Sequence, residues 1–245
     1  MQLYNKIKKN FIQPFKMIRD YKEGTIPLFN IHLGNSGNER VNSWYKILNK
    51  KHPLFGKYSA GTFGLSLIDM NKFNLFSDYE NSVRGKDFVS VKCSRCLKRG
   101  YTFDVLDRNK HIDEIFSINT SSNERQGKKM SNNYIKKDEF YIKEDSTEYF
   151  GVFDKEGKLV SYIHVFFAEE AAFIFKLLGH DSYLNDNIMY LMIFKAIEQI
   201  FKKRDETSKK LRYIIYDSFF TNSEGLAFFK RRFGFSPAAV KWTMD

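Results

Sequence analysis

Residues 149–179 read YFGVF-DKEG-KLVSYIHVFF-AEE-AAFIFKLLG, three apolar stretches separated by two short polar turns. Aromatic and β-branched residues bounded by turn residues are typical of strands, so we expect strands over 149–153, 158–167 and 171–179. Gly157 supplies the positive φ that a tight hairpin turn needs. The stretch therefore predicts a three-stranded antiparallel meander.

Downstream of the meander the spacing of apolar residues changes. After the polar stretch 180–187, residues 188–203 repeat apolar side chains at helical spacing and end in basic residues, as the helix dipole favours. A buried strand over 212–216, a helix over 223–233 and a strand over 239–243 come next. The order β-β-β-α-β-α-β predicts an α+β fold with a mixed, mostly antiparallel sheet flanked by helices.

Upstream, a similar but weaker pattern occurs. Strands are predicted over 61–69 and 101–106, with a helix over 78–100 between them. Because strand, helix, glycine and strand recur, we expect two related halves, a reduced one over 1–110 and a fuller one over 111–245.

The composition bounds the class of protein. The chain has 245 residues, a formal net charge of +11 and 17% aromatic residues, which argues against disorder and favours acidic partners. Two cysteines are too few for a disulfide framework and indicate a reducing compartment. No apolar run is long enough for a membrane span and no secretory signal is evident, so a cytoplasmic location is expected.

Two groups of basic residues are candidate contacts for the phosphate of a substrate. Arg125, Gln126 and Lys128 lie in the polar segment 120–148, and Arg84 and Lys86 flank a glycine in the predicted helix 78–100. Arginine offers a two-pronged donor and lysine a point charge. The alternative for both groups is a solvated basic surface. We expect 120–148 to be a loop or lid, because long irregular segments are often functional.

Two residues after predicted strands are candidate proton acceptors. His180 follows the third strand of the meander, and its ordinary pKa suits general base catalysis near neutral pH. Asp217 directly follows the strand predicted over 212–216. Asn187 and Tyr190, at the start of the next helix, are candidate substrate contacts, although Asn187 also suits a helix N-cap.

One helix carries both cysteines and a basic stripe. Cys93 and Cys96 form a lone C-x-x-C, which favours packed thiols over a zinc site because a structural zinc ion needs four ligands. We predict no metal site. The stripe of Lys92, Arg95 and Lys98, extended by Arg99, either faces phosphates or is simply solvated.

Three sequence segments, taken in their order along the chain, resemble the GNAT acyltransferases, and within them the Fem-type branch. That branch transfers acyl or aminoacyl groups and is built from two GNAT-like halves. The three segments are the basic helix Asp78–Gly100, the segment Ile115–Thr120 followed by Arg125, and the terminal helix Glu224–Gly234. The resemblance covers residues 60–245. It implies a phosphorylated acyl donor, either acyl-CoA or an aminoacyl-tRNA, an amine acceptor, and a sheet that opens beside residues 179–188.

The stretch 179–190 departs from the usual GNAT pattern. GNAT enzymes place an Arg/Gln-x-x-Gly-x-Gly/Ala loop there, whose N–H groups cradle the pyrophosphate of CoA. This chain has no glycine after Gly179, and Asp181 and Asp186 would repel phosphate. Acyl-CoA therefore remains a possible donor, without the usual loop to hold it.

Two functions are compatible with these features. The first is transfer of an acyl or aminoacyl group to an amine, with His180 or Asp217 as the proton acceptor. The second is a non-catalytic binding module for RNA or another polyanion that uses the same basic surface.

Overall fold

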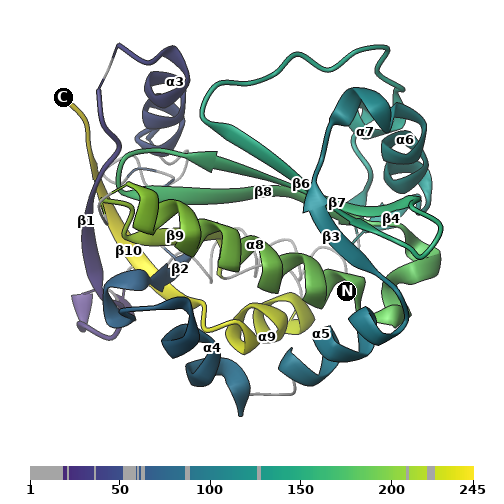
Figure 1. Cartoon of the computed structure of the whole chain (residues 1–245). Coiled ribbons are helices and arrows are strands. Elements are labelled where there is room, and N and C mark those ends of the chain that lie inside the picture. The colour runs from purple at the N-terminus through teal and green to yellow at the C-terminus, as the bar shows by residue number, and fades with distance from the viewer. Residues whose placement is uncertain are drawn as a thin grey trace, which may run out of the picture. The chain divides into compact units, whose positions relative to one another are not determined.

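The structure, a computed structural model, describes residues 19–20, 22–35, 37–51, 59, 61, 64–85, 89–125, 128–207, 210–219 and 224–245. By their contacts these residues divide into two compact units, and Figure 1 labels the elements of both. Unit 1 comprises residues 1–72, 168–172 and 210–245, and unit 2 comprises residues 73–167 and 173–209. The predicted division at residue 110 into two GNAT-like halves stays a prediction.

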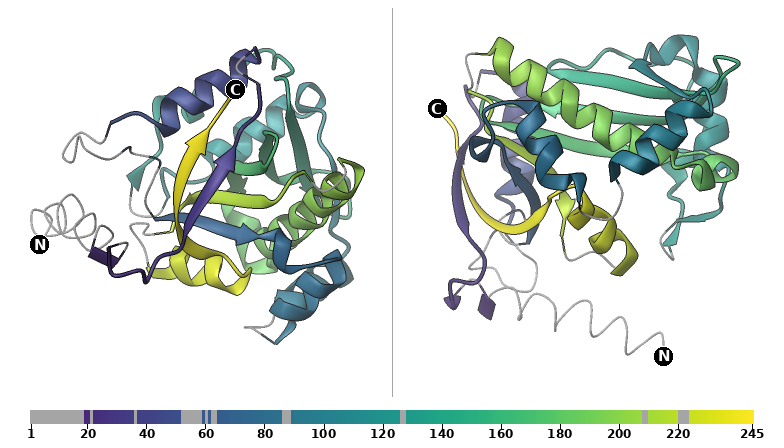
Figure 2. Two further views of the ribbon diagram at one scale, coloured as in Figure 1. Left: turned by 90° about the vertical axis from the view of Figure 1, so that its left-hand side faces the viewer. Right: turned by 60° about the horizontal axis from the view of Figure 1, so that its bottom comes forward.

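Unit 1 combines segments from both ends of the chain. Its elements are β1 (Leu28–His32), α3 (Glu39–Leu48), β2 (Leu65–Asp69), the 3-10 helix η2 (Met70–Lys72), β9 (Tyr213–Ser218), α9 (Glu224–Arg232) and β10 (Ser236–Thr243). The strand order is β1-β10-β2-β9. β1 runs parallel to β10, from Leu28 opposite Ala239 to His32 opposite Thr243, and the two strands lie side by side in Figure 2. The other two pairs are antiparallel.

The hairpin at Glu169 and Glu170 joins two segments of unit 1 by hydrogen bonds and an ion pair. A polar turn of this kind predicts solvated carboxylates, but Glu170 accepts a hydrogen bond from the N–H of His32 at 2.7 Å and forms an ion pair with Arg212 at 3.2 Å. Its carbonyl oxygen also accepts from the N–H groups of Arg212 and Tyr213. The interpretation as a solvated turn is therefore wrong for Glu170, because neighbouring segments supply partners that the local sequence does not reveal.

Unit 2 contains the meander and its covering helices. Its elements are α4 (Phe76–Arg84), α5 (Val89–Lys98), β3 (Thr102–Val105), η3 (Arg108–Lys110), α6 (Ile112–Thr120), β4 (Glu124–Arg125), β5 (Lys128–Lys129), α7 (Asn132–Ile135), β6 (Thr147–Phe153), β7 (Leu159–Phe167), most of β8 (Ala171–Gly179), η4 (Asp181–Asp186) and α8 (Ile188–Glu206). The strand order is β8-β7-β6-β3. The predicted α+β fold, with a mostly antiparallel sheet and flanking helices, is confirmed.

The β6–β7 hairpin forms as its sequence predicts. Gly157 has φ +81°, and the carboxylate of Asp154 accepts hydrogen bonds from the N–H groups of Glu156 and Lys158, both at 3.0 Å. The side chain of an aspartate and the freedom of a glycine thus fix a turn that the flanking apolar runs then extend into strands.

Two helices cover opposite faces of β7. Successive residues of a strand point to opposite faces. Tyr162 donates a hydrogen bond to Asn119 of α6, whereas the neighbouring Ser161 contacts Met189 of α8. β7 is buried along nearly its whole length for this reason, so its two-sided apolar sequence reflects a central strand.

Two sequence expectations need correction. The predicted single helix over 78–100 is two helices, α4 and α5, because α4 ends at Gly85. The segment 120–148 is also more ordered than predicted, since it contains β4 paired with β5 and the short helix α7. The predicted helix start at Ser223 lies outside the described residues.

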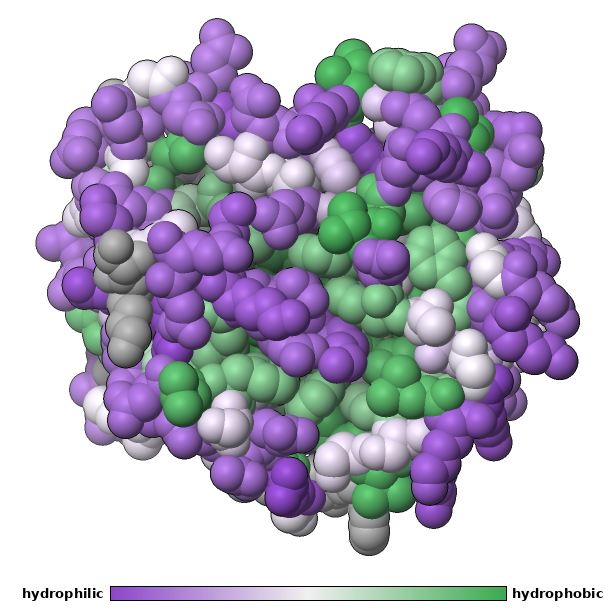
Figure 3. Space-filling view, viewed as in Figure 1, coloured by the Kyte–Doolittle hydropathy of each residue, from purple (hydrophilic) through white to green (hydrophobic). Residues whose placement is uncertain are grey.

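The surface of the described residues is mixed in character. Hydrophilic residues make up much of the face drawn in Figure 3, with apolar residues between them. Among the described residues, no helix has both the length and the apolar character that a membrane span requires.

Candidate functional site

Arg125 connects α6 to the end of β8. Its guanidinium donates hydrogen bonds to the carbonyl oxygen of Gly179 at 2.9 Å, to that of Ile118 at 2.8 Å and to the hydroxyl of Ser121 at 3.1 Å. Arg125 therefore lies beside residues 179–180, where the predicted site begins. Three of its hydrogen bonds are made within the protein, so its predicted role as a contact for a substrate phosphate stays a prediction.

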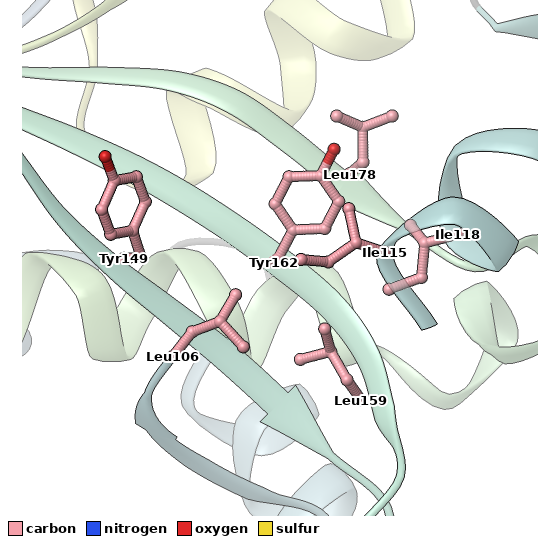
Figure 4. Close-up of a cluster of buried hydrophobic side chains, with 7 residues drawn as sticks. All are labelled: Leu106, Ile115, Ile118, Tyr149, Leu159, Tyr162 and Leu178. Carbon is pink, nitrogen blue, oxygen red and sulfur yellow. The ribbon is translucent and has the colours of Figure 1, made fainter. Parts of the chain in front are cut away.

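Ile118, whose carbonyl oxygen Arg125 binds, belongs to a cluster of buried aromatic and aliphatic side chains (Figure 4). Burial lowers the pKa of Arg125 and raises the pKa of Tyr134 and of Tyr162. The Tyr162 hydroxyl donates to Asn119 at 2.6 Å, so this buried polar group is satisfied. The cluster consists of Leu106, Ile115, Ile118, Tyr149, Leu159, Tyr162 and Leu178.

His180 caps the 3-10 helix η4. Its Nδ1 accepts a hydrogen bond from the N–H of Ser182 at 3.3 Å. Burial, followed by the charge of Lys158, lowers its pKa, so the ring is neutral at pH 7. With Nδ1 as the acceptor, the single proton of the neutral ring sits on Nε2, which then donates instead of accepting. The predicted role of His180 as general base stays a prediction, and this hydrogen bond argues for a donor.

The turn before α8 is bonded to the short segment between α5 and β3. Asp186 forms an ion pair with Arg99 and accepts a hydrogen bond from the hydroxyl of Tyr101 at 2.6 Å. Asn187 occupies the N-cap position with φ +67°, but its side chain makes no capping hydrogen bond. The ring of Tyr190 lies under the ammonium group of Lys92, 4.0 Å from the ring centre. Asn187 and Tyr190 thus share one end of unit 2 with His180.

The remaining predicted phosphate contacts are only partly described. Arg84 is the last residue of α4 and is exposed. No hydrogen bond or ion pair within the described ranges links it to residues 179–190. Lys86 and Gln126 lie outside the described residues, as does the side chain of Lys128, whose backbone pairs with Arg125 in the β4–β5 ladder.

Asp217, in unit 1, has an unusual backbone. It is exposed and lies in β9 with φ +49°, a conformation that L-residues rarely adopt. The fully buried ammonium of Lys230 donates to the carbonyl oxygens on either side of it, Tyr216 at 2.8 Å and Ser218 at 2.6 Å. Burial lowers the pKa of Lys230 to about 8. Sequence analysis did not single out Lys230, because one lysine among three consecutive basic residues gives no signal of burial.

The two cysteines of α5 are packed thiols, as predicted. Cys93 and Cys96 are free and buried, and burial raises the pKa of each to about 12, which keeps both protonated and unreactive at neutral pH. Within the described part of the chain, no three His, Cys, Asp or Glu side chains gather in a way that could hold a metal ion.

Solved structures support the fold, although sequence comparison finds no relative. No family model matches the sequence, and no curated protein does. A structure of FemX superposes with a TM-score of 0.54 at 12% identity, covering 71% of this chain and 59% of that one. The chain has the GNAT fold. The expected resemblance is thus confirmed for the fold.

Two other structures are similar over a comparable span. L-PGS from Bacillus licheniformis gives a TM-score of 0.48 at 13% identity, over 72% of this chain and 58% of that one. A GCN5-related N-acetyltransferase from Kribbella flavida gives 0.42 at 11% identity, over 74% and 56%. The chain spans less than three fifths of the length of each of these three structures.

Proposed function

We propose that the chain is an acyltransferase that moves an acyl or aminoacyl group from an activated ester to an amine. The observation that carries the proposal is the end of β8. There, in a GNAT fold, the guanidinium of Arg125 fastens Gly179 next to His180, and the start of α8 presents Asn187 and Tyr190 on the same end of unit 2.

The chemistry asks little of the protein beyond orientation and proton transfer. The amine nitrogen attacks the carbonyl carbon of the donor and forms the C–N bond, and the carbonyl oxygen takes up negative charge. The bond to the donor's leaving oxygen or sulfur then breaks, and that atom takes a proton. The proton that the amine loses passes to solvent, and the predicted role of Asp217, in unit 1, as a proton acceptor stays a prediction. His180, protonated on Nε2, is suited to donate a hydrogen bond to the developing oxyanion.

An acyl-transfer assay with two donor classes tests the proposal. Acetyl-CoA or alanyl-tRNA is mixed with a lysine-containing peptide, and the amide product is measured by mass spectrometry. We expect amide from at least one donor, and a fall in kcat of about 10²-fold or more in His180→Ala, with little change in KM. His111→Ala, at a second partly exposed histidine of unit 2, is the control. Absence of amide with both donors contradicts the proposal.

A second candidate function is a non-catalytic module that binds RNA or another polyanion. The specific observation in its favour is the basic stripe at the end of α5, where Arg95 and Lys98 of the helix and the following Arg99 are exposed. Binding of RNA that falls steeply with salt, without turnover of either donor, would favour this function.

A further inference from the structure

The turn between β8 and α8 is where acyl-CoA enzymes of the GNAT fold hold a pyrophosphate. Such a site needs a glycine-rich backbone, free N–H groups and positive potential at the start of a helix. In this chain the residues of the same turn affect which acyl donor can bind at this end of unit 2. The inference rests on the proposed function, because only an acyltransferase has an acyl donor to select.

The backbone of this turn does not offer a glycine cradle. Gly179 is the last glycine before α8, and the space beside its Cα is already filled. A Cβ placed there would lie 2.6 Å from the sulfur of Met189 and 3.1 Å from Leu184. Because Gly179 has no side chain, Met189 and Leu184 pack directly against its backbone. These side chains leave no room for a phosphate oxygen.

Most N–H groups of the turn are already used. Five of them donate within the chain: His180 to the carbonyl oxygen of Val160, Asp181 to the hydroxyl of Ser121, Ser182 to Nδ1 of His180, Tyr183 to the carbonyl oxygen of His180, and Asn187 to that of Leu184. The N–H groups of Tyr190 and Leu191 both point to the carbonyl oxygen of Asn187. The helix itself then leaves the N–H groups of Ile188 and Met189 as its first-turn donors.

A carboxylate precedes those two donors in the chain. Asp186 lies two residues before Ile188, and its side chain is 35% exposed. Arg99 and Tyr101 bind both of its oxygens. The cation that could have attracted a phosphate is therefore paired with an internal anion, and a phosphate arriving here would meet like charge.

We infer that Asp186 determines donor specificity by excluding the pyrophosphate of CoA from the start of α8, with Arg99 and Tyr101 holding its carboxylate in place. The chain therefore accepts acyl donors that are not held by a pyrophosphate at the start of this helix. Neutralising Asp186 releases Arg99 for an anion at the start of α8.

Calorimetric titration with acetyl-CoA and with inorganic pyrophosphate tests this inference. The variants are Asp186→Asn, which keeps the shape and removes the charge, and Asp186→Ser in case the first does not fold. Asp181→Asn is the matched control, since it removes a charge from the same turn without touching Arg99 or Tyr101. Circular dichroism establishes that each variant is folded.

We expect wild-type protein to bind both probes with Kd above about 1 mM, and either Asp186 variant to bind them at least tenfold more tightly. The Asp181 variant should change less than threefold. Micromolar binding of acetyl-CoA by the wild-type chain would overturn the inference, whatever the variants do. So would a folded Asp186 variant that binds no more tightly than Asp181→Asn.

Titration separates this inference from the proposed function. Binding is measured without turnover, so failure of acyl transfer with every donor would contradict the proposed function and leave the effect of Asp186 on binding intact. Conversely, amide formation with alanyl-tRNA together with unchanged binding in the Asp186 variants would contradict the inference alone.

Discussion

Lys230 and Asp217 show how one buried side chain can fix the conformation of another residue. An ammonium group in the protein interior is costly unless its donors are satisfied, and Lys230 satisfies two of them on the carbonyl oxygens that flank Asp217. Its charge also lies 4.3 Å from the ring centre of Tyr216. These contacts hold both peptide groups around the left-handed φ of Asp217, which would otherwise be unfavourable by about 1–3 kcal/mol.

The lowered pKa of Lys230 predicts a pH dependence of stability. Its folded-state pKa is about 8 and its ordinary value 10.5. Between these values the unfolded chain still binds the proton that the folded chain has released, so the free energy of unfolding rises with pH. Relative to Lys230→Met, the wild-type value should rise by up to about 3 kcal/mol from pH 7 to pH 10.5.

Urea unfolding of both proteins at several pH values measures this difference. Other groups titrate equally in the two chains, so the change in their difference isolates Lys230. Lys241→Met, which removes an exposed lysine of β10, should give a curve parallel to that of wild type. Parallel curves for Lys230→Met as well would show that its ammonium is not held as described.

At the residue scale, the sequence predicts which residues lie near one another but does not predict their hydrogen-bond and ion-pair partners. Arg125 and His180 are expected to share a site, and they lie side by side at Gly179. The hydrogen bond from Arg125 to the carbonyl oxygen of Gly179 and the ion pair of Asp186 with Arg99 join residues more than 50 positions apart. No local pattern encodes such distant partners.

At the scale of elements, local signals are enough for the meander. β8 begins and ends where its sequence predicts, and β6 and β7 differ by two residues or fewer, because polar turns bound apolar runs at each end. β1 escapes prediction, since its partner β10 comes from the other end of the chain. The break between α4 and α5 is underestimated, because one glycine within a helical pattern is often tolerated.

The link between α6 and the end of β8 predicts a loss of stability in Arg125→Ala. Three hydrogen bonds from a half-buried guanidinium would be lost, and the carbonyl oxygens of Ile118 and Gly179 would lose a donor. We expect the free energy of unfolding to fall by about 2 kcal/mol. Arg125→Lys should recover less than half, because a single ammonium cannot span both carbonyl oxygens.

Urea unfolding measures this effect, with Lys129→Ala as a control in the neighbouring strand that should change stability by less than about 0.5 kcal/mol. Unchanged stability in Arg125→Ala would mean that the guanidinium is free for a substrate phosphate, as the sequence predicts. A loss of substrate affinity alone would not distinguish the two roles, since a loosened end of β8 also displaces His180.

At the scale of the whole molecule, the chain order does not follow the units. Unit 1 takes residues from the first 72 positions, from the hairpin at 168–172 and from residues 210–245. The pairing of β1 with β10 and of β2 with both β9 and β10 ties these segments together. Sequence periodicity compares neighbouring residues, so it could suggest two consecutive halves but could not show a unit assembled from three separated segments.

The net charge of +11 predicts long-range attraction to polyanions, and the exposed basic residues of α5 are one place where such a partner can bind. On α5, Arg95 and Lys98 are exposed and Lys92 packs on Tyr190, whereas Arg99, the residue after the helix, pairs with Asp186. We therefore expect the double variant Arg95→Ala/Lys98→Ala to weaken binding of single-stranded RNA, because phosphate contacts release counterions. The slope of log K against log salt should become shallower by about 1.4.

Fluorescence anisotropy of a labelled single-stranded RNA, titrated at several KCl concentrations, measures the affinity and its salt slope. The matched control is Lys143→Ala/Lys202→Ala, which removes the same charge from two exposed lysines away from α5. If binding responds only to net charge, the two double variants will weaken it equally, and α5 is then a solvated face. If the α5 variant alone flattens the slope, contacts with phosphate are localised on this helix, because a loss of two contacts changes the slope only where those contacts were made.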